Sequence, residues 1–307
     1  MTGEATEAAD PTSLRQLRAL LDRHGFRPRR SLGQTFLVDG NIARKIVCLA
    51  RISAADSVLE VGAGVGALTH ALAEAAGRVV AVEVHPALVA MLRETLGAAA
   101  HPPHRVEIVE ADVLQLPWPE VLGEERRGQW KAVANLPYSI TGPAILRLLE
   151  AKEWLERLVI MVQREVAERL AAQAGERARG QLSVLVQAFC HVRVAAQVSR
   201  NCFWPRPKVD STVLVLEVRR PALVRTEVEP VFRQLVQGAF SARRKMLANA
   251  LGPVLRAESR SVPPRQVARL LLARSGIAPD LRAEDVSEEA FVRLAEAAAD
   301  LGREAEI

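Results

Sequence analysis

One short stretch combines residue types suited to holding a planar heterocyclic amine: Asn135, Leu136, Pro137 and Tyr138. It follows an apolar run, residues 132–134, that predicts the end of a buried strand. Pro137 fixes φ and lacks a backbone N–H, so the strand cannot continue there as an interior ladder. Asn135 offers a carboxamide, and Tyr138, the one tyrosine in 307 residues, offers a flat ring. We interpret the stretch as a pocket for an adenine base; the other interpretation is a proline-terminated strand end with an incidental aromatic residue.

Glycines upstream form a second candidate site, because they come directly after a predicted strand at residues 57–61. Gly62, Gly64 and Gly66 lead from it into a predicted helix. Glycines permit a sharp turn and close approach to a ligand, and a helix N-terminus presents free N–H groups. Glu83 ends the next predicted strand, 21 positions after Gly62, where a carboxylate can accept ribose hydroxyls. The pattern fits a dinucleotide site, a site for S-adenosyl-L-methionine, or a purely structural turn.

The other strand ends favour S-adenosyl-L-methionine. A nicotinamide enzyme needs a partner for hydride transfer, and the sequence offers no acid/base dyad for that chemistry. The methyl-donor interpretation uses Glu83 for the ribose and Asp112, just after a predicted strand at 106–109, for the adenine amine of the cofactor. It also accounts for Asn135–Tyr138, which would form the pocket for the adenine that receives the methyl group, separate from the adenine of the cofactor.

Strand and helix patterns alternate from residue 57 to residue 162, with polar residues at successive strand ends. This alternation predicts an α/β fold with a doubly wound, Rossmann-like sheet. Residues 192–197 and 209–218 predict an additional antiparallel pair. Beyond Arg220 only short amphipathic helices are predicted. We therefore expect a cofactor-binding domain in residues 1–220 and a small all-helical domain in residues 221–307.

Basic residues dominate the charge, with a net charge of +5 and a pI of about 9.5. Most are arginines, whose planar guanidinium suits phosphate and base contacts, although a GC-rich genome would also favour arginine. We predict that three basic segments contact nucleic acid, the alternative being solvated basic faces. Their residues are Arg29, Arg30, Arg206, Lys208, Arg243, Arg244 and Lys245.

Several other classes of site are disfavoured. Cys48, Cys190 and Cys202 are widely spaced without a C-x-x-C motif, which argues for a reducing compartment and against a disulfide framework or a zinc site. No apolar run reaches membrane-spanning length. The acidic N-terminal residues lack a hydrophobic signal core, so we expect a cytoplasmic protein. Since the cysteines offer no zinc motif, we also expect that the protein needs no metal.

Five motifs occur in one order: Gly33–Leu37, Glu60–Gly66, Asn135–Tyr138, Phe203–Ser211 and Ala239–Lys245. On these motifs the chain, over roughly residues 14 to 298, resembles the ribosomal RNA adenine N6,N6-dimethyltransferases of the KsgA type. The resemblance implies a methyltransferase that uses S-adenosyl-L-methionine to dimethylate two adjacent adenines in the 3′-terminal hairpin of 16S rRNA. It implies the 30S particle as substrate, during small-subunit biogenesis, and we expect the enzyme to be a monomer.

The resemblance also implies roles for single residues. Cofactor contacts are expected from Thr35, Leu37, Gly62, Glu83, Asp112 and Asn135. Thr35 departs from the family, which often has asparagine there. At the strand end formed by Asn135–Tyr138, the Asn135 side-chain oxygen and the Leu136 carbonyl are each expected to accept a hydrogen bond from the adenine amine. Tyr138 is expected to stack on one face of the base and Phe203 on the other.

Two further alternatives remain beside an oxidoreductase that binds a dinucleotide at the glycine turn. A 23S rRNA methylase of the antibiotic-resistance type would share the chemistry, but the Phe203–Ser211 motif and the long basic C-terminal segment disfavour it. A non-catalytic RNA-binding factor could retain the fold, but the intact Gly62, Glu83, Asp112 and Asn135 argue against that.

Overall fold

The structure is a computed structural model that describes residues 10–29, 33–97, 105–257 and 263–305. Contacts between residues divide it into two compact units. The first unit comprises residues 1–167 and 193–218, and the second comprises residues 168–192 and 219–307. The predicted boundary near residue 220 assigns residues 168–192 to the first domain, whereas the contacts place them in the second unit.

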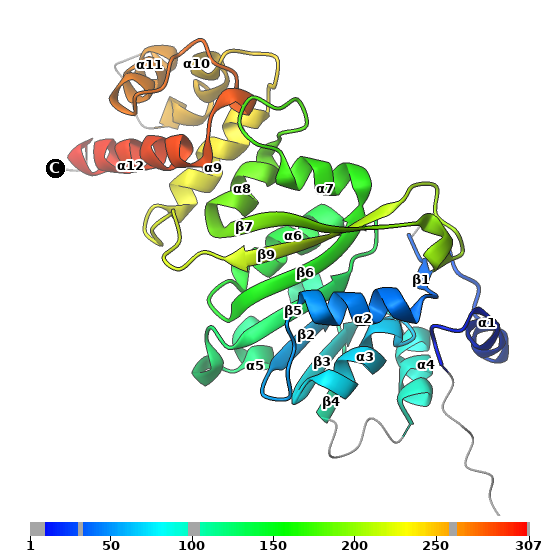
Figure 1. Cartoon of the computed structure of the whole chain (residues 1–307). Coiled ribbons are helices and arrows are strands. Elements are labelled where there is room, and N and C mark those ends of the chain that lie inside the picture. Colours follow the sequence, from blue (N-terminus) through cyan, green and yellow to red (C-terminus); the bar gives the residue numbers. More distant parts are fainter. Residues whose placement is uncertain (1–9, 30–32, 98–104, 258–262, 306–307) are drawn as a thin grey trace, which may run out of the picture. The chain divides into compact units, whose positions relative to one another are not determined.

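A seven-stranded sheet with the order β4-β3-β2-β5-β6-β9-β7 forms the core of the first unit (Figure 1). The pairs β2–β3, β3–β4, β2–β5 and β5–β6 are parallel, whereas β9 runs antiparallel to β6. The chain order reverses beside β2, so this is the switch point at which open α/β sheets bind ligands. The predicted doubly wound sheet is confirmed. Its strands are β2 (Ser57–Val61), β3 (Arg78–Glu83), β4 (Arg105–Glu110), β5 (Trp130–Asn135), β6 (Leu155–Gln163), β7 (Cys190–Val198) and β9 (Ser211–Val218).

The central strands are covered on both faces, as their continuous apolar runs predict. All five residues of β2 are buried, and so are the last five of β3. Ile46 and Leu72 from the neighbouring helices pack with the strands in one hydrophobic cluster. The predicted bounds of β2 and β3 are confirmed, while β4 extends one residue beyond the predicted 106–109 at each end.

Helices connect the strands and close the first unit. Asp39 caps α2, since its carboxylate accepts hydrogen bonds from the N–H groups of Asn41 and Ile42. No helix of the described residues is both long enough and apolar enough to cross a membrane. The helices up to residue 171 are α1 (Leu14–Arg23), α2 (Gly40–Leu49), α3 (Ala67–Ala75), α4 (Pro86–Leu96), α5 (Trp118–Leu122), α6 (Thr141–Glu150) and α7 (Arg164–Ala171).

A two-stranded ribbon joins two of the sequence motifs. Strand β1 (Phe36–Leu37) pairs antiparallel with β8 (Phe203–Trp204), so that Leu37 lies opposite Phe203. The Gly33–Leu37 and Phe203–Ser211 motifs therefore meet in space although they are far apart in the chain.

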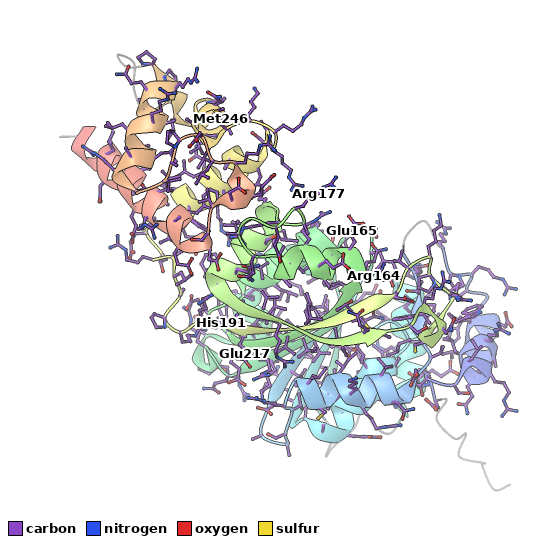
Figure 2. The ribbon with its side chains drawn as sticks, turned by 45° about the horizontal axis from the view of Figure 1, so that its top comes forward. Arg164, Glu165, Arg177, His191, Glu217 and Met246 are labelled. Atoms are coloured by element: carbon purple, nitrogen blue, oxygen red, sulfur yellow. The ribbon has the colours of Figure 1, made fainter. Side chains whose placement is uncertain are left out.

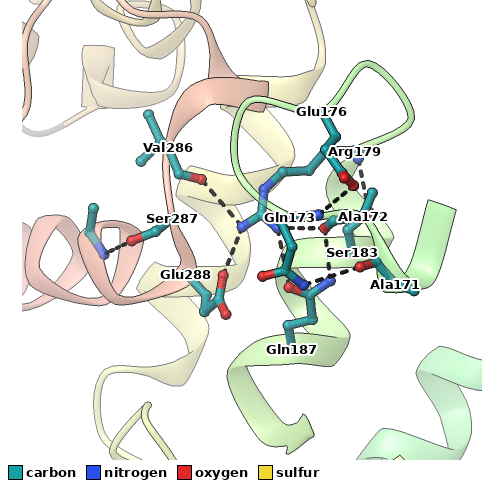
Figure 3. A network of polar contacts seen from close by, with 12 residues as sticks. Ala171, Ala172, Gln173, Glu176, Arg179, Ser183, Gln187, Val286, Ser287 and Glu288 are labelled. Atoms are coloured by element: carbon teal, nitrogen blue, oxygen red, sulfur yellow. Dashed lines mark hydrogen bonds and ion pairs between the residues drawn. The ribbon is translucent and has the colours of Figure 1, made fainter. Parts of the chain in front are cut away.

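The second unit is helical, and α9 packs against α12 while α10 packs against α11. The fully buried Arg179 holds residues 168–192, the N-terminal part of this unit, in place (Figure 3). Its guanidinium donates to Glu288 Oε2 at 2.8 Å, to the Ala172 carbonyl at 2.9 Å and to Gln187 Oε1 at 3.2 Å. These contacts explain why residues 168–192 belong with the C-terminal helices. The helices are α8 (Gln181–Phe189), α9 (Glu229–Phe240), α10 (Leu247–Leu251), α11 (Pro264–Arg274) and α12 (Glu288–Ala305).

Candidate active site

The glycine turn after β2 adopts the backbone conformations that its sequence predicts. Gly62, Gly64 and Gly66 have φ values of 77°, 58° and 99°, which favour glycine, and Gly66 is the N-cap of α3. A Cβ atom at Gly62 would lie 3.3 Å from the Asn135 carbonyl oxygen. The turn after β2 and the tip of β5 are therefore in close contact.

Glu83, at the end of β3, is tied to the same turn. Its Oε2 accepts a hydrogen bond from the Gly64 N–H at 2.9 Å, and its Oε1 accepts from the N–H groups of Val84 and His85, each at 3.0 Å. A carboxylate has roughly four acceptor positions, so these bonds leave about one for a ligand. Three of its acceptor positions are thus used by the backbone, and its contact with a ribose stays a prediction.

A cavity of about 270 Å³, here called the glycine-turn cavity, opens at this edge of the sheet. It brings together most of the residues predicted to contact the cofactor: Thr35, Leu37, Gly62, Glu83 and Asn135.

Asp112 differs from the other predicted cofactor residues. It does not line the glycine-turn cavity, and its Oδ1 accepts a hydrogen bond from the Leu114 N–H at 2.9 Å. The side chain caps the short 3₁₀-helix that follows β4. The sequence prediction missed this because an acid after a strand can serve either a ligand or the next turn.

A second cavity of about 390 Å³, here called the Tyr138 cavity, adjoins the first. The two share Gly33, Thr35 and Ser139 as lining residues. The second cavity is lined in addition by Tyr138, Gln163, Arg206, Pro207 and Lys208. Of these Gln163 was missed, and its position at the end of β6, in line with the other strand-end polar residues, was the available signal.

The tip of β5 stands between the two cavities. Asn135, Leu136 and Pro137 line the glycine-turn cavity, whereas Tyr138 lines the other. The Leu136 N–H donates to the Met161 carbonyl at 3.3 Å, which continues the sheet by one residue. The Pro137 carbonyl accepts from the Thr141 hydroxyl at 3.0 Å and so joins the tip to α6. The stretch predicted to bind an adenine is therefore held by the sheet on one side and by a helix on the other.

Phe203 lies elsewhere than predicted. It is only 3% exposed, belongs to the hydrophobic cluster of the first unit and pairs with Leu37 in the ribbon. It lines neither cavity. The predicted stacking of Phe203 on the base does not agree with this position, because the β1–β8 pairing turns its ring into the core.

Glu60 is an unusual residue of the glycine-turn cavity. It lies within β2, is 1% exposed, and neither of its carboxylate oxygens has a hydrogen-bond partner in the protein. Burial raises its pKa to about 8, and the charge of Glu83 adds to the effect. The carboxyl is therefore mostly protonated at neutral pH. A lone acid in an otherwise apolar strand was the sequence signal for this site.

Val84 is a second residue that the sequence analysis missed. Its side chain is 61% exposed, although it follows directly on a buried strand, and it lines the glycine-turn cavity. Its place next to Glu83 offers an apolar surface at the point where a ribose would bind.

The predicted RNA-binding residues fall into different surroundings. Arg206 and Lys208 are exposed at the Tyr138 cavity, and Arg29 lines a separate hollow with Arg27 and His85. Arg30 lies outside the described residues.

In the second unit, Arg243 is held in place by donating to the carbonyls of Arg177 and Arg179 at 3.0 and 2.9 Å. Arg244 and Lys245 are exposed, and Met246 beside them is 50% exposed. Met246 is labelled in Figure 2. Arg243 thus has a structural role in this unit, whereas its two neighbours are open to a partner.

Solved structures of similar fold define the class of protein. A dimethyladenosine transferase from Plasmodium falciparum matches with a TM-score of 0.73 and 24% identity, over 87% of this chain and 98% of that one. The 23S rRNA methyltransferase ErmE matches with a TM-score of 0.62 and 27% identity, over 85% of this chain and 98% of that one. The fold and the site at its switch point are those of a Rossmann-like methyltransferase.

The sequence comparisons narrow the class to one family. The family model "Ribosomal RNA adenine dimethylase" matches residues 25–300, and the chain belongs to this family. A "Ribosomal RNA small subunit methyltransferase A" from Pelotomaculum thermopropionicum is 42% identical over 93% of this chain and 96% of its own length. A protein of the same name from Ligilactobacillus salivarius is 37% identical over 98% of this chain and 99% of its own length.

Proposed function

We propose that this enzyme uses S-adenosyl-L-methionine to dimethylate the N6 amines of two adjacent adenosines in the 3′-terminal hairpin of 16S rRNA, on the 30S particle. The observation that carries the proposal is the pair of adjoining cavities that meet at the Asn135–Tyr138 tip. One cavity suits a methyl donor and the other a base. The small-subunit target is supported by relatives named for it that are about as long as this chain. We further propose that the enzyme acts as a cytoplasmic monomer.

The glycine-turn cavity fits the parts of S-adenosyl-L-methionine. Glu83 would accept a ribose hydroxyl, and Val84 would offer an apolar contact beside the ribose. Glu60, with no protein partner for either carboxylate oxygen, would face the positively charged amino-acid end. When bound, the cofactor supplies an electrophilic methyl group on a sulfonium.

The residues of the β5 tip would prepare the adenine amine, whose lone pair is delocalised into the ring. The Asn135 side-chain oxygen and the Leu136 carbonyl would each accept a hydrogen bond from one N–H of the amine. These two bonds draw the nitrogen toward a tetrahedral geometry. Tyr138 would stack on the base after it has left the RNA stack. Catalysis then rests on positioning and on electrostatic stabilisation.

RNA would be held by basic residues of both units. Arg206 and Lys208, exposed at the Tyr138 cavity, would contact phosphates next to the captured base. Arg244 and Lys245 of the second unit would also contact RNA, and we propose the same role for Arg29 and Arg30.

The decisive experiment incubates the protein with labelled S-adenosyl-L-methionine and undermethylated 30S particles, followed by mapping of the modified nucleotides. We expect dimethylation of two adjacent adenosines near the 3′ end of 16S rRNA. Label on 23S rRNA alone would favour the antibiotic-resistance type of methylase. No transfer to any RNA, with cofactor binding intact, would favour a non-catalytic assembly factor.

Substitution of Asn135 tests the role of the β5 tip. Asn135→Ala removes one acceptor for the amine protons, so we expect methyl transfer to be lost while cofactor affinity, measured by calorimetry, stays within about tenfold. Asn41→Ala, an exposed change on α2, is the matched control and should retain activity. Retained dimethylation by the Asn135 variant would refute the proposed contact with the amine.

A further inference from the structure

The hydroxyl of Tyr138 is held by a residue that is far away in the sequence. Its oxygen lies 2.9 Å from Ser211 Oγ, at the start of β9. Thr35, just before β1, lies near the same hydroxyl and acts on its pKa. A phenol can donate one hydrogen bond and accept another, and the bond to Ser211 uses part of this capacity. The hydroxyl is therefore engaged in positioning the ring.

Ser211 is well suited to fix a ring. It is 1% exposed and lies opposite Gln163 in the β6–β9 ladder, so its Oγ is attached to the sheet. Tyr138, by contrast, lies in the connection between β5 and α6. A bond from the sheet to the far end of the ring restricts both torsion angles of the tyrosine side chain.

We propose that Ser211 is a positioning residue, which holds the Tyr138 ring as a preformed platform for the base in the Tyr138 cavity, with Thr35 as the second support. The proposal rests on the proposed function for the stacking role of Tyr138. It also gives a role to the serine that ends the Phe203–Ser211 motif. Because Thr35 lines both cavities, the platform is joined to the wall of the glycine-turn cavity.

A spectroscopic test is available because the chain contains one tyrosine. Biosynthetic incorporation of 3-fluorotyrosine labels Tyr138 alone, so a single ¹⁹F resonance reports on this ring. Burial raises the pKa of the Tyr138 phenol, and Ser211 and Thr35 oppose that rise. In Ser211→Ala we expect a ¹⁹F shift toward the free amino acid and a further rise of the phenol pKa. Ser211→Thr keeps a hydroxyl and should restore both values in part.

The kinetic test measures methyl transfer to 30S particles. Loss of one hydrogen bond predicts a fall in kcat/KM for RNA of about fivefold to tenfold, with the dissociation constant of S-adenosyl-L-methionine changed less than about twofold. Tyr138→Phe removes the same bond from the other side, together with any support from Thr35, and should lose at least as much. The double variant Tyr138→Phe/Ser211→Ala should lose no more than Tyr138→Phe alone, because both changes remove the shared Tyr138–Ser211 interaction.

Thr212→Val is the matched control. Thr212 is the next residue of β9, is equally buried and donates its hydroxyl hydrogen to Gln197 Oε1 at 3.0 Å. It should leave the ¹⁹F resonance and the kinetics of RNA methylation unchanged.

The outcomes separate this inference from the proposed function. An unmoved resonance in Ser211→Ala, or a moved resonance with unchanged kcat/KM, would overturn the positioning role, and so would additive losses in the double variant. If wild-type protein transfers no methyl to any RNA, the proposed function fails, while the ¹⁹F data still decide whether Ser211 orders the ring.

Discussion

Replacement of Glu60 by glutamine should change how the stability of the first unit depends on pH. The pKa of this carboxyl rises from an ordinary 4.5 to about 8 in the folded protein, because burial penalises the charged form. Between these values the folded state keeps a proton that the unfolded state has released. Stability from this group is therefore fully present below pH 4.5 and is lost as the pH rises to about 8.

The size of the effect follows from the two pKa values. At about 1.36 kcal/mol for each pH step, the contribution of Glu60 should fall by about 2 to 3 kcal/mol between pH 5.5 and pH 7.5. Glutamine has nearly the same shape and does not titrate. The difference in unfolding free energy between wild type and Glu60→Gln should therefore change by this amount over the same interval.

Urea unfolding followed by tryptophan fluorescence measures this difference, because all four tryptophans lie in the first unit. The exposed Glu120 provides the control, and Glu120→Gln should shift the curve equally at both pH values. If wild type and Glu60→Gln lose stability in parallel as the pH rises, the carboxyl is ionised in the folded state and the reasoning is refuted. The four tryptophans are Trp118, Trp130, Trp154 and Trp204.

Two further predictions concern the second unit. Arg179→Met leaves the Glu288 carboxylate buried without its partner and should destabilise this unit by about 3 to 5 kcal/mol, seen as faster hydrogen exchange in α8 and α12. Arg179→Met/Glu288→Leu should recover most of the loss, and a double variant as unstable as the single one would contradict this account. Arg244→Glu/Lys245→Glu should weaken RNA binding and reduce its salt slope by roughly 1 to 2. An unaltered slope would mean that RNA docks elsewhere. Arg243→Ala, the comparison, should instead loosen the Arg177–Arg179 loop that it holds.

Local chemistry explains what could be predicted from the sequence alone. The strands at 57–61 and 78–83 stand out because parallel strands covered on both faces consist mainly of apolar residues. The turn at Gly62–Gly66 stands out because its positive φ values favour glycine. Asn135 and Tyr138 stand out because they lie on either side of Pro137, which prevents the strand from continuing. These features depend on neighbouring residues, so they can be read from the order of amino acids.

Tertiary structure decided which distant residues meet. The β1–β8 pairing turned Phe203 into the core, and the β6–β9 register brought Ser211 to the hydroxyl of Tyr138. The Arg179 contacts joined residues 168–192 to the C-terminal helices. In each case a side chain could satisfy its burial or its hydrogen bonds in more than one way. The choice was made by long-range strand pairing and helix packing, which leave no local pattern in the sequence.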